Sequence, residues 1–116
     1  MYKYKVWYQR PEFFPHGIMG AEWLISKGKM PAPDDLEASH VYLMEIEALN
    51  LNDAFRKMQA EVWSPNGEAS GMIQALDLAH TSMSTGDILV DVTNSRAPHP
   101  YIVDTRGFVL LQKVQA

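Results

Sequence analysis

The chain has no cysteine among its 116 residues, which excludes disulfide bonds, thiolate metal sites and cysteine catalysis. It also has no apolar stretch long enough for a signal peptide or a membrane span, so we expect a cytoplasmic protein without membrane contact. Hydrophobic residues make up 47% and charged residues 21% of the chain, as in ordinary soluble proteins. At this length we expect a single domain, residues 1–116, with a modest core.

Short motifs that mark common functional sites are absent as well. No glycine-rich loop is followed by Lys-Ser or Lys-Thr, so a phosphate-binding loop is excluded. No nucleophile elbow surrounds a serine. The histidines lack the HxH or HxxxH spacing of metal ligands; they are His16, His40, His80 and His99. We therefore predict no metal site, and nothing in the sequence indicates a cofactor.

The net charge of −4 is unevenly distributed along the chain. Residues 1–31 carry five basic and two acidic residues, residues 32–91 carry two basic and eleven acidic residues, and residues 92–116 carry three basic and one acidic residue. A protein that wraps nucleic acid needs a basic footprint, so the acidic middle of the chain argues against that function.

Period-2 alternation of apolar residues predicts a mainly antiparallel sheet of about five strands. Residues 2–9 alternate aromatic residues with lysines, which is typical of an edge strand with its lysines in solvent. Residues 40–47 place apolar side chains on both faces, as a central strand does. Residues 88–93, 101–103 and 108–111 are predicted to form three consecutive antiparallel strands, a meander.

One main helix is predicted over about residues 51–63, packed on one face of the sheet. Its apolar stripe consists of Leu51, Phe55, Met58 and Val62. Asn50 is placed to cap its first turn, and residues 64–67 (Ser-Pro-Asn-Gly) predict a turn after it. The predicted fold class is therefore α+β.

Two shorter helices are also predicted. Residues 20–28 favour a short helix that ends at Gly28, with a strand as the alternative, and residues 72–79 favour another. Gly86 and Gly107 stand in turn sequences before two of the predicted strands, and we expect both to adopt positive φ angles.

The irregular segment at residues 10–20 combines two prolines and two glycines with several apolar side chains. Phe13, Phe14 and His16 could form a binding loop that offers aromatic anchors around the histidine. Alternatively, the segment folds back over the core, which its apolar content favours. Both interpretations stay open at this point.

Residues 80–87 hold the other candidate site, formed by His80, Ser82, Ser84 and Asp87. These side chains could bind a ligand, or serve a small hydrolase built on His80, Ser84 and Asp87. Serine and aspartate also hydrogen-bond nearby backbone groups in ordinary turns, which favours a structural role at the start of the strand that follows.

A family resemblance rests on this same region. Residues 80–90 read HTSMSTGDILV, and Tyr101-Ile-Val-Asp104 and Gly107-Phe108 follow. The pattern resembles the YodL-like family of small bacterial and phage proteins, and residues 51–55 (LNDAF) match a helix of that family. The resemblance covers about residues 40–111, the expected YodL-like core, and residues 1–39 have no counterpart in it. It implies a bacterial or phage accessory protein and implies no activity.

The leading hypothesis is therefore a non-enzymatic binding or interaction module whose partner is a protein or a small ligand. The first alternative is a nucleic-acid-binding module that uses a basic-aromatic strip of Lys3, Lys5, Tyr8 and Arg10. The second is the small hydrolase, so the sequence leaves open whether the protein is an enzyme.

Overall fold

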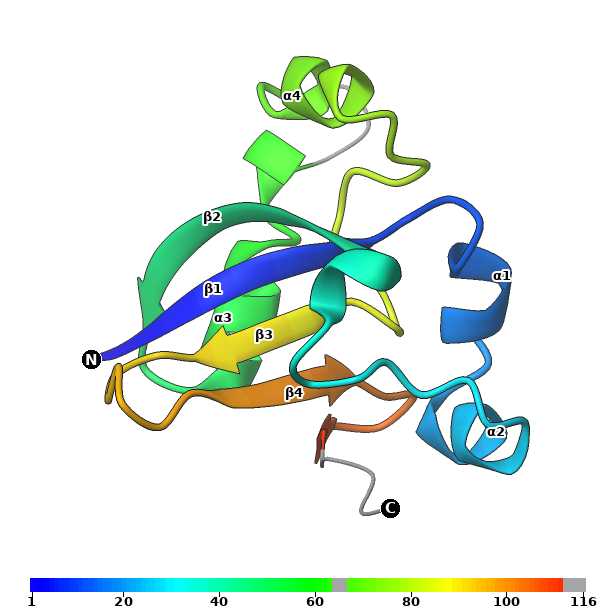
Figure 1. The fold of residues 1–116 in the computed structure, drawn as a ribbon. Helices are drawn as coiled ribbons and strands as arrows, with labels where there is room; N and C mark the ends of the chain where they lie inside the picture. The colour runs from blue at the N-terminus through cyan, green and yellow to red at the C-terminus, as the bar shows by residue number, and fades with distance from the viewer. Residues whose placement is uncertain (64–66, 112–116) are drawn as a thin grey trace.

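The computed structural model describes residues 1–63 and 67–111, which form a five-stranded antiparallel sheet with short helices around it (Figure 1). The strand order is β2-β1-β3-β4-β5. The strands are β1 (Tyr2–Gln9), β2 (His40–Ala48), β3 (Ile88–Asp91), β4 (His99–Val103) and β5 (Phe108–Leu110). The helices are α1 (Phe14–Gly17), α2 (Ala21–Ser26), α3 (Leu51–Lys57) and α4 (Ser70–Ala75), with 3-10 turns η1 (Leu36–Ala38) and η2 (Glu61–Trp63). The predicted α+β class is confirmed.

The meander is also confirmed, because β3 pairs with β4 and β4 with β5. The predicted places of the first two strands are wrong: β1 lies inside the sheet between β2 and β3, and β2 is an edge strand. Lys3 and Lys5 are exposed on one face, as are Glu47 and Glu45 of β2, which lie opposite them. The alternation of side chains shows which face of a strand is exposed to solvent. An edge strand is defined instead by backbone groups that lack a partner, so the alternation could not distinguish an edge strand from a central one.

One face of the sheet packs against α3. Its buried cluster joins β1, α3 and the segment before β3 through Tyr4, Val6, Tyr8, Met58, Met83 and Leu89. The Asn50 side chain accepts a hydrogen bond of 2.8 Å from the backbone N–H of Asp53, so the predicted cap is confirmed. The helix ends at Lys57 rather than near residue 63, and Val62 is 44% exposed.

The early end of α3 coincides with contacts to a distant part of the chain. The carbonyl of Met58 accepts the N–H of Met83 at 3.2 Å, and the Gln59 side chain donates to the carbonyl of Met83 at 3.1 Å. These contacts turn the chain toward the loop before β3 instead of continuing the helix. The turn predicted at residues 64–67 falls mostly outside the described residues.

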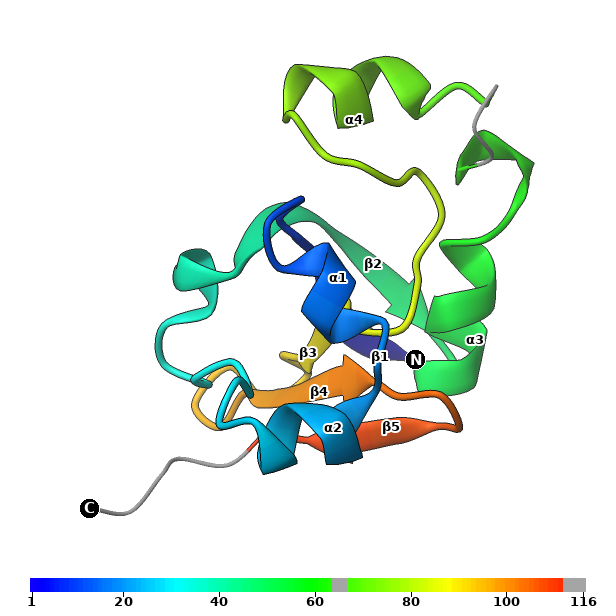
Figure 2. The same cartoon turned by 90° about the vertical axis from the view of Figure 1, so that its right-hand side faces the viewer.

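The other face is covered by the N-terminal segment that the sequence left open. Leu24 of α2 and Leu36 of η1 pack on β3 and β4, around Ile88 and Ile102. This second face is therefore covered over β3 and β4, and it is open over β1 and β2, where Lys3 and Lys5 are exposed. Figure 2 shows α2 beside β4 and β5, α1 in front of β3, and α4 standing apart from the sheet. Among residues 1–63 and 67–111, no helix is both long and apolar enough to cross a bilayer.

Gly86 and Gly107 have φ angles of 100° and 74°, which confirms the prediction for both. They differ in their surroundings. A Cβ at Gly107 would meet nothing within 4 Å, whereas a Cβ at Gly86 would lie 2.4 Å from Gln9 Oε1 and 2.7 Å from Gly17 Cα. Gly86 is therefore required both by its backbone angle and by the close approach of α1.

Candidate functional site

Asp87, directly before β3, is fully buried and is the centre of a polar cluster. Its carboxylate accepts hydrogen bonds from the backbone N–H of Gln9 at 2.9 Å and from that of Ser84 at 2.8 Å. His80 Nε2 lies 2.8 Å from the same carboxylate. Burial raises the pKa of the Asp87 carboxyl, and the three donors oppose that rise. The carboxylate thus joins β1, the turn at residue 84 and His80.

His80 is held between aromatic rings as well as by Asp87. Its ring stacks on Tyr8 with centroids 4.7 Å apart, and the Phe14 ring lies 4.9 Å away. The Tyr8 hydroxyl donates to the carbonyl of Thr81 at 2.8 Å, and burial raises the pKa of that hydroxyl. His80 Nδ1 is buried and has no hydrogen-bond partner among the described residues. The ring is therefore fixed in place, with 9% of the side chain exposed.

The two predicted serines do not complete a catalytic triad. The Ser82 hydroxyl donates to the carbonyl of Trp63 at 2.9 Å, and the Ser84 hydroxyl donates to the carbonyl of Ser82 at 3.3 Å. A triad needs a nucleophile hydrogen-bonded to the histidine that the carboxylate orients. The structure brings His80 and Asp87 together but directs both hydroxyls to backbone acceptors.

His40 forms a second layer that the sequence did not point to. Its Nε2–H donates to the carbonyl of Gly86 at 2.7 Å, and the Ser39 hydroxyl donates to Nδ1 at 2.7 Å. Burial lowers the pKa of His40 to about 4, so the ring is neutral near pH 7 and its Nδ1 is free to accept the Ser39 hydrogen. His40 is 46 residues from Gly86 in the sequence, so no local pattern could have indicated the contact.

The aromatic residues of the N-terminal segment cover this cluster. Phe14 contacts His80, and the Phe13 ring lies 5.2 Å from that of His40. The His16 ring stacks on Trp23 at 5.8 Å and lies edge-on to Phe13 at 6.3 Å. The candidate residues of segment 10–20 therefore contact those of segment 80–87. Phe13 and Phe14 cover the polar cluster and are partly buried, so they are not exposed anchors.

The predicted basic-aromatic strip is not assembled. Tyr8 is fully buried on the face opposite Lys3 and Lys5, because successive side chains of a strand alternate between faces. Lys5 instead lies over the Tyr42 ring at 5.9 Å, and each lysine faces a glutamate of β2. This surface carries mixed charge and lacks the concentrated positive charge that a nucleic-acid backbone requires.

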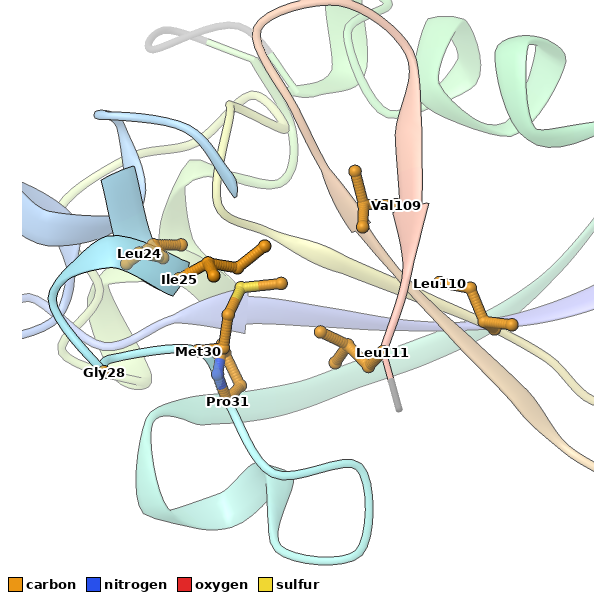
Figure 3. A pocket seen from close by; sticks show the side chains of 8 residues that line it. All are labelled: Leu24, Ile25, Gly28, Met30, Pro31, Val109, Leu110 and Leu111. Atoms are coloured by element: carbon orange, nitrogen blue, oxygen red, sulfur yellow. The ribbon is translucent and has the colours of Figure 1, made fainter. Parts of the chain in front are cut away.

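An apolar pocket of about 490 Å³ opens between α2 and β5 (Figure 3). Its lining consists of Leu24, Ile25, Gly28, Met30, Pro31, Val109, Leu110 and Leu111. Every one of these side chains is apolar. The pocket can therefore hold an apolar group, and its lining offers no acid, base or nucleophile for a reaction on that group.

The pocket follows from how α2 ends. Gly28, with φ of 65°, reverses the chain after α2, so that Met30 and Pro31 return along β5. Leu24 is buried against the sheet, whereas the next residue, Ile25, is 63% exposed at the pocket. The face between helix and strand is thus only partly filled, and Figure 3 shows Ile25 and Met30 reaching toward β5.

Sequence reasoning missed this pocket. One signal was present: residues 108–111 are four apolar residues in succession, although a half-buried strand needs only alternate ones. Among the residues that the structure describes, no group of three His, Asp or Glu side chains could hold a metal ion. Comparisons with family models, with curated proteins and with solved structures found no match to the chain.

Proposed function

We propose that the protein is a binding module whose α2–β5 pocket receives an apolar group of its partner. The supporting observation is the pocket itself, a cavity of about 490 Å³ whose lining side chains are apolar and include the exposed Ile25. Cavities of this size with a mostly apolar lining are the usual places where proteins bind ligands. The polar cluster at Asp87, in contrast, has its hydrogen bonds directed inward.

The resemblance of residues 40–111 to the YodL-like family stays a prediction. It agrees with this proposal only in implying an accessory protein without an assigned reaction. The pocket lies between a strand of the YodL-like core and a helix of the N-terminal segment, Ala21–Ser26. On this proposal, residues 1–39 add the second wall of the binding site to that core.

Anilinonaphthalene sulfonate, a fluorescent apolar anion, tests the proposal directly. We expect its fluorescence to rise on binding to the parent protein, and to be lost in Ile25→Glu, which places a charge at the pocket. Ile18→Glu is the matched control, because Ile18 is also exposed, at 44%, but does not line the pocket. Equal dye binding by the two variants, or no binding by the parent, would refute the pocket as the binding site.

The hydrolase alternative has one observation in its favour, the 2.8 Å contact between His80 and Asp87. Its test is the hydrolysis of p-nitrophenyl acetate by the parent and by His80→Gln. We expect the same low rate from both, because His80 Nδ1 is buried and both serine hydroxyls donate to backbone carbonyls. A rate that depends on His80 would instead support an enzyme.

A further inference from the structure

The outer edge of β5 presents unpaired backbone groups next to the pocket. In the β4–β5 ladder the N–H of Leu111 donates to the carbonyl of Pro100 at 2.8 Å, and the carbonyl of Gly107 accepts from Asp104. Hydrogen-bonded positions alternate along an antiparallel pair, so Val109 also faces β4. Phe108 and Leu110 must therefore point their N–H and C=O groups away from the sheet, where no described strand pairs with them.

The two edges of the sheet differ in how they are protected. The β2 edge carries exposed Glu45 and Glu47, and charged residues of this kind discourage a further strand from pairing. The β5 edge has the sequence Phe-Val-Leu and carries no charge. Of the two, β5 is the edge that can accept an added strand.

The rim of the pocket indicates the charge of the partner. Lys27 and Lys29 flank Gly28, which lines the pocket, and both lysines are exposed. The ion pairs among the described residues involve neither of them. A partner with acidic residues beside its apolar group would therefore gain favourable charge contacts at this rim.

Building on the proposed function, we propose that the partner is an extended, acidic peptide segment that adds a strand to β5. Its backbone bonds to the outward groups of Phe108 and Leu110, an apolar side chain enters the pocket, and its acidic residues face Lys27 and Lys29. Strand addition of this type takes affinity from the main chain and specificity from pockets that receive alternate side chains.

A second copy of the chain fits this edge less well. A two-fold interface places each patch against the same patch of the other copy, so it would join two basic rims. Only two residues of β5 offer outward backbone groups, and nothing acidic in the pocket lining would offset the repulsion. An acidic peptide satisfies the same backbone groups and has complementary charge.

The first test uses the peptide acetyl-Glu-Thr-Val-Leu-Val-Thr-Glu-amide, added to the full chain. We expect it to displace anilinonaphthalene sulfonate, and we expect the version with both Glu changed to Lys to bind at least about tenfold more weakly. Two further versions carry N-methyl groups on opposite sets of alternate amides. One set should abolish binding and the other should be tolerated, because a paired strand uses only alternate N–H groups.

The second test changes the protein. Leu110→Pro removes the outward N–H, which an edge strand tolerates, whereas Leu110→Ala keeps it. We expect Leu110→Pro to bind the peptide at least about tenfold more weakly than Leu110→Ala. Because Leu110 lines the pocket, both variants lose the same side chain there, and dye binding should fall to the same extent in the two. Hydrogen exchange should show that the peptide protects the amides of Phe108 and Leu110 in the parent and changes that of Val109 little.

The possible failures are distinguishable. Dye binding at the pocket without peptide binding would refute the peptide and leave the proposed function standing, whereas absence of dye binding would refute the proposed function. Equal binding of the acidic and lysine peptides would also overturn the inference. So would protection of Phe108 and Leu110 that rises with protein concentration in the absence of peptide, because a second copy would then occupy the edge.

Discussion

Replacing Asp87 by asparagine tests whether the polar cluster is structural. The carboxylate acts only as a hydrogen-bond acceptor, and its donors are Gln9, Ser84 and His80. An amide has one oxygen and one NH2 group, so in either orientation its NH2 group faces at least one of these donors. The donors from Gln9 and Ser84 are backbone N–H groups and cannot become acceptors. Only a change of the His80 tautomer could give the new NH2 group an acceptor.

The expected cost follows from these contacts. A buried donor that loses its acceptor costs about 1–3 kcal/mol, and the relief of burying a neutral group in place of a carboxylate offsets part of it. We expect Asp87→Asn to lower the free energy of unfolding by about 2 kcal/mol. For a domain of this size that corresponds to a fall in Tm of roughly 8 °C.

Thermal melts followed by circular dichroism measure this effect. Asp34→Asn is the matched control, because Asp34 is exposed, and its Tm should stay within about 2 °C of the parent. A functional polar cluster is commonly held at some cost to stability, so its removal leaves the Tm unchanged or raises it. If Asp87→Asn has the same Tm as the parent, the structural role is refuted and the cluster becomes a candidate site.

Three further changes test other parts of the structure. His40 has a lower pKa in the folded state, about 4, than in the unfolded chain, about 6.5, so the folded state binds fewer protons between these values. The stability that neutral His40 contributes is therefore complete above pH 6.5 and is lost as the pH falls toward 4. Urea titrations over this pH range should show that the free energy of unfolding falls by roughly 3 kcal/mol in the parent and not in His40→Gln. Gly86→Ala should destabilise by about 3 kcal/mol, from backbone strain and overlap with α1, and Gly107→Ala by only about 1 kcal/mol; equal effects in urea titrations would contradict the crowding at Gly86. The Phe55 ring is half-buried and lies 6.2 Å from the Phe108 ring, so Phe55→Ala should lower the free energy of unfolding by about 2–3 kcal/mol. Arg56 is exposed, and Arg56→Ala should lower it by less than about 0.5 kcal/mol. Similar thermal melts for the two variants would show that the helix face is assigned wrongly.

The candidate site was predictable in part. The short polar residues before β3 indicated a turn rich in hydrogen bonds, and Ser84 and Asp87 do bond to each other within three residues. His40 and Gln9 complete the same cluster from β2 and β1, across 46 and 78 residues of sequence. Contacts over such separations depend on strand pairing, which a pattern along one strand does not encode.

The sequence alone determined the features that depend on local chemistry. Alternation along residues 88–111 produced the meander, Asn50 capped its helix, and Gly86 and Gly107 took positive φ because other residues resist that backbone region. Each of these features is set by interactions among residues close together in the chain.

Tertiary structure alone decided the sheet order and the binding surface. Whether β1 or β2 stood at the edge depended on which strand found a second backbone partner, and both had suitable side-chain patterns. The pocket exists because α2 and β5, more than eighty residues apart, approach without filling the space between them. Packing of distant elements is a property of the whole fold, and so the surface most suited to a partner was visible only there.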